Sequence, residues 1–397
     1  MLRLWRDMLA SALLLSPEPP FPAVGGGPLR SASVFTYLSK RYALDVITFR
    51  QPGAPDPRDA FPPGLARSIQ VMQLPHHSKS APARVVRNLN RAIRGRPPLL
   101  DRFSGFEREI EAAVANQHYE LAVIEHFWCA PYVVQLRPWC RRLVLDLHNI
   151  ESTWHATLAE SEGLASGILH RRFASNYRAL EALWLPRFDR LLVTSAVDAN
   201  RVGNRSIVYP NAIPLTPRPL RTERHEIIFT GNLEYQPNFT AILHFRNRIW
   251  PDLRKRWPEL VWTIAGKNPH AVQGLVSGDE RIRLNGPIED AVARIAQAQV
   301  AIVPLLAGSG TRIKIIEAWA AATPVVSTSI GAEGLEYQSG VQLIRADSPA
   351  EFSQAVSELL MNPAERTRIG DAGRQLFERT YTWEQSWLTL DTVLGNS

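Results

Sequence analysis

Cysteine is scarce in this sequence: 397 residues contain two, Cys129 and Cys140. Two cysteines cannot form a disulfide framework or a four-cysteine metal site, so we expect reduced thiols and a cytoplasmic protein. Long apolar runs are also absent, and none approaches the roughly 18 residues of a membrane-spanning helix. The first 15 residues weakly resemble a secretory signal, but Leu13–Leu15 followed by Ser16-Pro17 is more typical of a first buried strand.

Two other absences limit the chemistry. The sequence has no Asp-x-Asp motif to hold a divalent cation on a diphosphate, and we expect no cluster of histidines with carboxylates, hence no metal site. No pair of carboxylates stands out for hydrolysis of a glycosidic bond. The net charge of +7 favours anionic partners. Because the basic residues do not alternate with aromatic residues as in a stacking platform, a nucleic-acid partner is not expected.

Short apolar runs alternate with helical patterns along the whole chain. This alternation predicts βαβ units, and therefore an α/β protein with parallel sheets. The predicted strands cover residues 13–15, 44–49, 121–124, 143–147, 191–194, 226–229, 260–265, 282–284, 300–304, 324–328 and 342–344.

A proline-rich polar segment, residues 209–224, separates two series of strands. Segments of this composition are typical of linkers. We therefore expect a first Rossmann-like domain over residues 1–215 and a second over residues 216–375. A C-terminal helix is expected over residues 376–397.

The most informative segment is 300–333, which reads as strand, glycine-rich turn, helix and strand. The turn Gly308–Thr311 would expose backbone N–H groups at the start of a helix, an arrangement that binds phosphate. Arg312, Lys314 and Glu317 follow, and the spacing places the last two on one helix face. Cations suit phosphates and a carboxylate suits ribose hydroxyls, so the segment predicts a site for a nucleotide diphosphate.

Three more glycine turns follow predicted strands in this half, near Gly231, Gly266 and Gly286. In a parallel sheet all of these turns lie at one edge. Their convergence favours a single ligand site over unrelated chain reversals.

The first half has two weaker signals. Gly25–Gly27 follows the first strand, and we expect a helix from about Leu29, with Pro28 at its first position and Arg30 adding a charge. Later, Asp146–Glu151 (DLHNIE) places polar groups at the end of a strand, where they can point into a ligand crevice. Two alternatives stay open: Asp146 or Asn149 caps the next helix, or His148 is a satisfied core residue.

The order of these motifs resembles that of family 4 glycosyltransferases. The matching segments are GNL–PN, AG, NGPI, VPLLAGSGTRIKIIEAWAAATPVVST and GAEGL, together with GGG, DLHN and YPNAI in the first half. The resemblance covers nearly the whole chain and is most specific over residues 231–335. It implies a GT-B architecture, in which two Rossmann-like domains face each other across a cleft. It also implies a hexosyl-type transferase that retains the anomeric configuration and needs no metal or other cofactor, with a nucleotide-diphosphate sugar as donor.

The resemblance assigns roles to residues of the 300–333 segment. Glu317 matches the second glutamate of the family's E-x7-E motif, which implies a hydrogen bond to the ribose. Ser309 stands where the first glutamate is expected, so backbone groups of Ser309, Gly310 and Thr311 would hold the donor sugar. The family's arginine and lysine after the first strand of this domain are missing, since Gly231 is followed by Asn232. Arg312 and Lys314 are therefore our candidates for the diphosphate.

Four further sites follow from the resemblance alone. It implies that Gly286-Pro287-Ile288 contacts the base and that Gly334-Leu335 lies near the ribose and phosphates. Gly26 and Gly27 would face the diphosphate from the opposite domain. His148 would lie near the sugar and the reacting oxygen.

The acceptor side carries a basic helical pattern within residues 79–102. Arg84, Arg87, Arg91 and Arg94 recur every three or four residues, beside Val86, Leu89 and Ile93. Such a pattern is typical of helices that rest on anionic membranes, and equally of ordinary solvated helices. It predicts a glycan or lipid-linked acceptor of the cell envelope or exopolysaccharide, and a peripheral position at the inner membrane face.

Two other functions remain open. A GT-B nucleotide-sugar epimerase would need acid and base side chains around the sugar instead of an acceptor cleft. A noncatalytic nucleotide-sugar-binding relative is suggested by Ser309 and Asn232.

Overall fold

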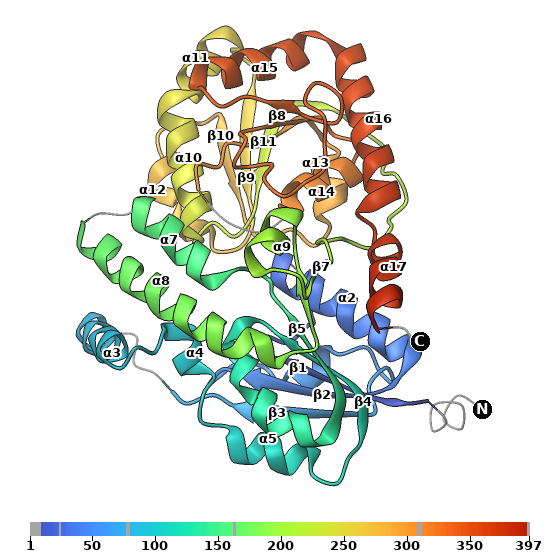
Figure 1. Cartoon of the computed structure of the whole chain (residues 1–397). Coiled ribbons are helices and arrows are strands. Elements are labelled where there is room, and N and C mark those ends of the chain that lie inside the picture. The colour runs from blue at the N-terminus through green and yellow to red at the C-terminus, as the bar shows by residue number, and fades with distance from the viewer. Residues whose placement is uncertain (1–8, 24, 77–79, 162–163, 308–311, 395–397) are drawn as a thin grey trace. The chain divides into compact units, whose positions relative to one another are not determined.

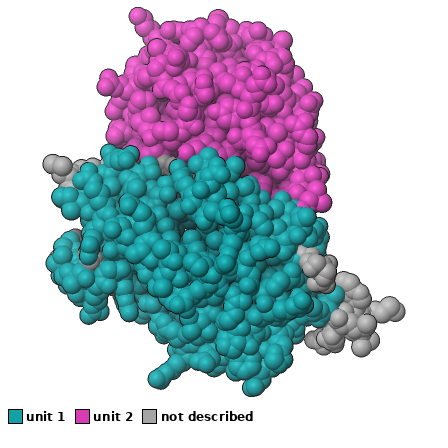
Figure 2. Space-filling view, in the orientation of Figure 1, with its two compact units in different colours: residues 1–209, 389–397 teal, residues 210–388 magenta. Residues whose placement is uncertain are grey.

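The computed structural model describes the chain except for residues 1–8, 24, 77–79, 162–163, 308–311 and 395–397. The chain divides into two units, residues 1–209 with 389–397 and residues 210–388 (Figure 2). Among the described residues, none of the helices is both long and apolar enough to cross a membrane.

The first unit is built on a seven-stranded sheet of order β3-β2-β1-β4-β5-β6-β7, in which every pair is parallel (Figure 1). Its strands are β1 (Ser11–Ser16), β2 (Ala43–Arg50), β3 (Ser68–Gln73), β4 (Tyr119–Glu125), β5 (Cys140–Asp146), β6 (Arg190–Val193) and β7 (Ser206–Val208). Its α-helices are α2 (Gly26–Arg41), α3 (Ala81–Ile93), α4 (Pro98–Arg102), α5 (Glu107–Val114), α6 (Val133–Leu136), α7 (Glu151–Ser161), α8 (Leu164–Trp184) and α9 (Ala196–Val202). The two edge strands, β3 and β7, bury few side chains, and the apolar runs therefore did not predict them.

The second unit contains a six-stranded parallel sheet of order β10-β9-β8-β11-β12-β13. Its strands are β8 (Arg224–Thr230), β9 (Val261–Ala265), β10 (Ile282–Asn285), β11 (Ala298–Val303), β12 (Val325–Ser327) and β13 (Ile344–Arg345). Its α-helices are α10 (Gln236–Arg248), α11 (Trp250–Arg256), α12 (Gln273–Val276), α13 (Ala291–Ile295), α14 (Ile313–Ala320), α15 (Pro349–Met361) and α16 (Pro363–Thr380). The two parallel sheets confirm the predicted α/β fold.

The last helix, α17 (Trp383–Leu394), begins in the second unit, and its end belongs to the first. Within the first unit, the hydroxyl group of Tyr37 donates a hydrogen bond to Asp391 Oδ1 at 3.0 Å. Tyr42 likewise donates to the Leu394 carbonyl oxygen at 3.0 Å. These contacts join the end of α17 to α2 and to the residue that follows α2.

Candidate functional site

Helix α14 presents the predicted pair of charged side chains. Because Ile313, Ile316 and Trp319 are buried, the helix is fixed against its own unit, and Lys314 and Glu317 stay partly exposed on another face. Arg312 is buried at the N-cap, where its Nη2 donates to the Ile330 carbonyl oxygen at 3.3 Å. The predicted turn Gly308-Ser309-Gly310-Thr311 lies outside the described residues.

The amine of Lys314 reaches the carboxyl end of β8. It donates to Asn238 Oδ1 at 2.7 Å and lies 4.2 Å from the centre of the Phe229 ring. Asn238 is itself fixed, because its Nδ2 donates to the Asn232 carbonyl oxygen at 2.8 Å. A cation from α14 thus occupies the end of the strand where the resemblance found the usual arginine and lysine missing.

Two glycines allow the ends of β8 and β9 to approach closely. A Cβ atom on Gly266 would lie 1.7 Å from the Gly231 carbonyl oxygen, so no larger residue fits there. A Cβ atom on Gly231 would lie 2.8 Å from Asn238 Nδ2 and 3.2 Å from Lys314 Nζ. The Gly266 N–H points to the carbonyl oxygens of Asn285 and Gly286, at 3.3 and 3.2 Å. The turns at Gly231, Gly266 and Gly286 therefore meet at one edge, as predicted.

Two more predicted segments follow strands of this sheet. Gly286 and Pro287, after β10, are exposed, and Ile288 is half-buried. Gly334 and Leu335 follow β12, which neighbours β11; Gly334 has a φ of 81° and Leu335 is buried. Their contacts with base, ribose and phosphate stay predictions.

Although part of each side chain is exposed, burial of the ionisable ends brings the pKa values of Lys314 and Glu317 together. It lowers the pKa of Lys314 to about 7, helped by the charge of Arg312 and opposed by that of Glu317. It raises the pKa of Glu317 to about 7, an effect that Lys314 opposes. An anionic group placed beside Lys314 would stabilise its charged form, so ligand binding and protonation are coupled here.

In the first unit, α2 begins earlier than predicted. Gly25, with a φ of 90°, is the N-cap, and Gly26 and Gly27 form the first turn, so Pro28 is not the first helical residue. The left-handed backbone of Gly25 sets this start, and proline is tolerated within a first turn. The N–H groups of a first turn have no acceptor within the helix, so those of Gly26 and Gly27 can meet a ligand. That they do so remains a prediction.

The prediction for Arg30 as a ligand-facing charge is wrong. Its side chain is buried, and its Nε and Nη2 donate to the Asp146 carboxylate at 2.9 and 2.5 Å. Its Nη1 donates to the Tyr209 carbonyl oxygen at 2.6 Å. Asp146 therefore balances Arg30, and it does not cap α7, which begins at Glu151.

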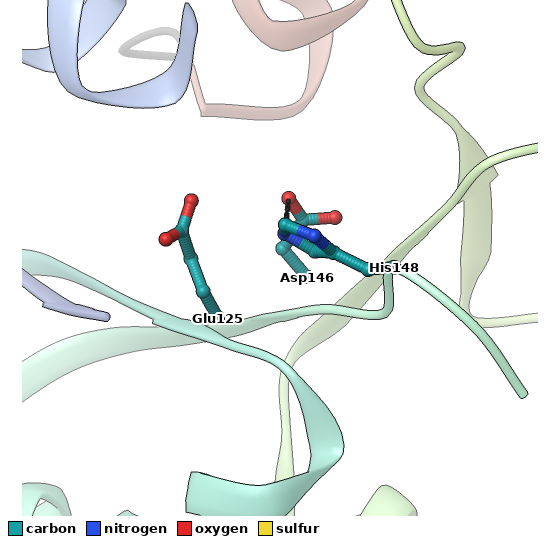
Figure 3. Close-up of side chains that lie close together, drawn as sticks. All are labelled: Glu125, Asp146 and His148. Carbon is teal, nitrogen blue, oxygen red and sulfur yellow. Dashed lines mark ion pairs between the residues drawn. The ribbon is translucent and has the colours of Figure 1, made fainter. Parts of the chain in front are cut away.

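Contrary to the sequence-based expectation, histidine and carboxylates do cluster in this unit. Ligand atoms of Glu125, Asp146 and His148 all lie within 4.8 Å of one another, with His148 Nε2 3.6 Å from Asp146 Oδ2 (Figure 3). The cause is register, since Glu125 and Asp146 are paired at the ends of β4 and β5. The sequence does carry a signal for this cluster, because a carboxylate stands at the end of each of two buried strands.

The cluster is balanced without an additional cation. Arg30 neutralises Asp146. Burial raises the pKa of Glu125 to about 8, and the nearby Asp146 adds to this shift, so the Glu125 carboxyl group is protonated at neutral pH. Ser16 Oγ donates to Glu125 Oε2 at 2.5 Å. The residues thus satisfy one another's charge, and we assign no metal to them.

His126 is a site residue that the sequence reasoning missed. It follows β4 as His148 follows β5, its φ is 60°, and its ring centre lies 3.7 Å from that of His148. The other face of its ring stacks on Trp128, with 4.1 Å between ring centres. Within the described chain, the ring nitrogens of both histidines are buried without a hydrogen-bond partner, and burial lowers both pKa values. Such unpaired nitrogens favour a hydrogen-bonding ligand over a satisfied core position.

Known proteins share parts of this chain and its fold. Residues 224–362 match the family model of the glycosyl transferases group 1. A 44.6 kDa protein of the cps region of Klebsiella pneumoniae is 22% identical over 367 residues, covering 88% of this chain and 90% of that protein. The structure of sucrose-phosphate synthase from Thermosynechococcus elongatus superposes with a TM-score of 0.74 at 16% identity, covering 97% of this chain and 98% of the other.

Anabaena HepE, in complex with UDP and glucose, superposes with a TM-score of 0.67 at 13% identity, covering 97% of this chain and 99% of the other. At such identities these structures establish the fold, and the family match lies on the unit that carries α14 and the three glycine turns. Together, the family match over residues 224–362 and the shared GT-B fold support a group 1 glycosyltransferase.

Proposed function

We propose that this glycosyltransferase is a retaining, metal-independent enzyme that transfers a hexosyl group from a nucleotide-diphosphate sugar to a glycan or lipid-linked acceptor. The observation that carries the proposal is the position of Lys314 Nζ, beside Gly231 at the end of β8, with Glu317 on the same helix face. In this arrangement Lys314 binds the diphosphate and Glu317 accepts a hydrogen bond from the ribose. The UDP and glucose bound by HepE support a nucleotide sugar as donor.

In the proposed reaction, the bond between the sugar's anomeric carbon and the leaving phosphate oxygen breaks. A bond from the acceptor oxygen forms on the same face, and the acceptor's proton passes to the departing phosphate. The nucleoside diphosphate leaves with the electron pair of the broken bond. Lys314 and the N–H groups of the first turn of α14 stabilise the charge that develops. Fixed donors of this kind contribute about 3 kcal/mol each to lowering the barrier.

The histidine pair of the first unit suits the sugar or acceptor end of the reaction. Because their pKa values are lowered, His126 and His148 are neutral at pH 7, and each imidazole offers one donor and one acceptor nitrogen. Neutral imidazoles match sugar hydroxyl groups, which also donate and accept. We propose that they bind hydroxyl groups and do not move a proton.

We place this reaction in polysaccharide synthesis, with the enzyme peripheral to the inner membrane face. The relative encoded in a cps region supports a role in polysaccharide synthesis, and its match extends over most of both chains. A lipid-linked acceptor would require the enzyme to work at the membrane face.

The test is a panel of UDP-, GDP- and ADP-sugars, with release of nucleoside diphosphate measured with and without an extracted lipid-linked acceptor. We expect acceptor-dependent release from one donor, unaffected by a metal chelator, and a product whose anomeric configuration by NMR matches the donor. Conversion of the donor to an epimer without acceptor would instead support an epimerase. Donor binding without release would support a noncatalytic protein.

A further inference from the structure

Helix α3 exposes its apolar face to solvent. Val85, Val86, Leu89 and Ile93 are 61–71% exposed, although they lie on one side of the helix. Apolar side chains in the surface helix of a globular protein normally face the core. A contiguous apolar surface of this kind marks an interaction site.

The opposite side of α3 holds the helix on its unit. Arg91 is buried, and its Nε donates to Asp101 Oδ2 at 2.8 Å. This bond joins α3 to α4. Helix α3 also contacts α8, and it lies beside both helices at one end of the first unit (Figure 1). The prediction that Arg91 belongs to a free basic face is therefore wrong: this arginine anchors the helix and turns its apolar side outward.

A basic pocket adjoins the apolar face. It has a volume of about 520 Å³, and Val86 belongs to both the pocket and the apolar face. Arg87, Arg94 and Arg96 line the pocket with Arg91, whereas Asp101, the acidic group lining it, is paired with Arg91. The sequence has no acidic residue from Ala60 to Leu100. The surroundings are therefore strongly positive.

We propose that α3 docks the enzyme on an anionic lipid bilayer. The apolar side chains enter the boundary between head groups and acyl chains, and the arginine-lined pocket receives a lipid phosphate. Charge complementarity favours a bilayer as the partner. An anionic leaflet supplies hydrocarbon for the apolar face and phosphates for the basic pocket, whereas a protein partner would need an acidic groove that matches both. The inference deepens the proposed membrane-side function but does not depend on the transfer chemistry.

The test is flotation of the full chain with vesicles of phosphatidylcholine alone and with vesicles that also contain phosphatidylglycerol. Wild type is expected to float mainly with the anionic vesicles. Leu89→Ser with Ile93→Ser should abolish flotation with both. Arg94→Gln with Arg96→Gln should remove the preference for anionic lipid, weakening partitioning about fivefold per arginine.

Matched controls remove exposed residues of the same kinds elsewhere. Leu220→Ser with Met361→Ser, and Arg248→Gln with Lys255→Gln, should float like wild type, because these side chains are exposed on the second unit. Circular dichroism and donor-dependent release of nucleoside diphosphate without vesicles check that each variant folds and works. Flotation that α3 substitutions leave unchanged, or no flotation of wild type, would overturn the proposal even if transfer is demonstrated. Flotation that depends on α3 without donor turnover would uphold it while the proposed function fails.

Discussion

The two sheets differ in how the charged residues at the carboxyl ends of their strands, here called the edge of each sheet, are compensated. At the edge of the first unit, Arg30 and Asp146 form a buried ion pair, and the buried Glu125 is protonated at neutral pH. At the edge of the second, Lys314 and Glu317 remain partly exposed on α14, beside glycines that leave room for a ligand. A charged residue after a parallel strand therefore does not by itself indicate ligand contact. It is available to a ligand only where its charge is not already compensated inside the fold. We expect substitutions of Arg30 and Glu125 at the first edge to change stability, and those of Lys314 and Asn238 at the second to change donor use.

The largest effect on stability is expected from Arg30→Met. The change leaves Asp146 buried without its partner, which costs about 3–5 kcal/mol when a buried ion pair is broken. Chemical denaturation of the purified variant measures it. Arg141→Met is the control, because that arginine pairs with Glu120 at an exposed position and should change stability by less than about 1 kcal/mol. Equal losses in the two variants would mean that the Arg30 pair does not organise this edge.

Glu125→Gln should show a pH-dependent gain in stability. Burial raises the pKa of Glu125 to about 8 in the folded state, against 4.5 for an ordinary glutamate. The stability that the folded protein gains from this proton is complete below pH 4.5 and is lost as the pH rises through 8. Glutamine stays uncharged, so the variant should match wild type at pH 4 and exceed it by a few kcal/mol at pH 9. A stability difference independent of pH would contradict the burial of an ionisable group here. Glu289→Gln, at an exposed position, is the control.

At the second edge, Lys314→Arg should change the pH profile of donor use. Wild-type kcat/KM should fall above about pH 7, as Lys314 loses its proton, and below about pH 7, as Glu317 gains one. Arginine stays charged, so the variant should keep only the acid limb. Relative to wild type, its kcat/KM should improve about tenfold or more between pH 7 and pH 9. Parallel profiles would exclude Lys314 as the group that titrates.

A smaller effect is expected from Asn238→Ala. The change removes the acceptor that orients the Lys314 amine, which is worth about 1–2 kcal/mol and should raise the donor KM several-fold with little change in kcat. Asn238→Asp keeps this acceptor but loses the Nδ2 donor to the Asn232 carbonyl oxygen and adds a negative charge beside the diphosphate site, so it should also raise the donor KM. If both variants behave like wild type, Asn238 does not position the lysine.

Much of the second edge was predictable from sequence, and little of the first. The glycine turns at Gly231, Gly266 and Gly286 follow buried strands of a parallel sheet, so their meeting follows from topology alone. That Lys314 would reach Asn238 required the three-dimensional path of α14. At the first edge, the Glu125–Asp146 pairing depends on the register of β4 against β5, which periodicity does not determine. Arg30 was misassigned because sequence spacing cannot tell a cation that meets a ligand from one that meets a buried carboxylate.

The most direct test of the central claim is calorimetric binding of the preferred nucleoside diphosphate to wild type and to Lys314→Ala. Loss of a charged donor to the diphosphate should weaken binding about 10- to 100-fold. Lys255→Ala, on the exposed side of α11, should bind like wild type. Equal affinity of wild type and Lys314→Ala would contradict the assignment of this edge to the donor diphosphate.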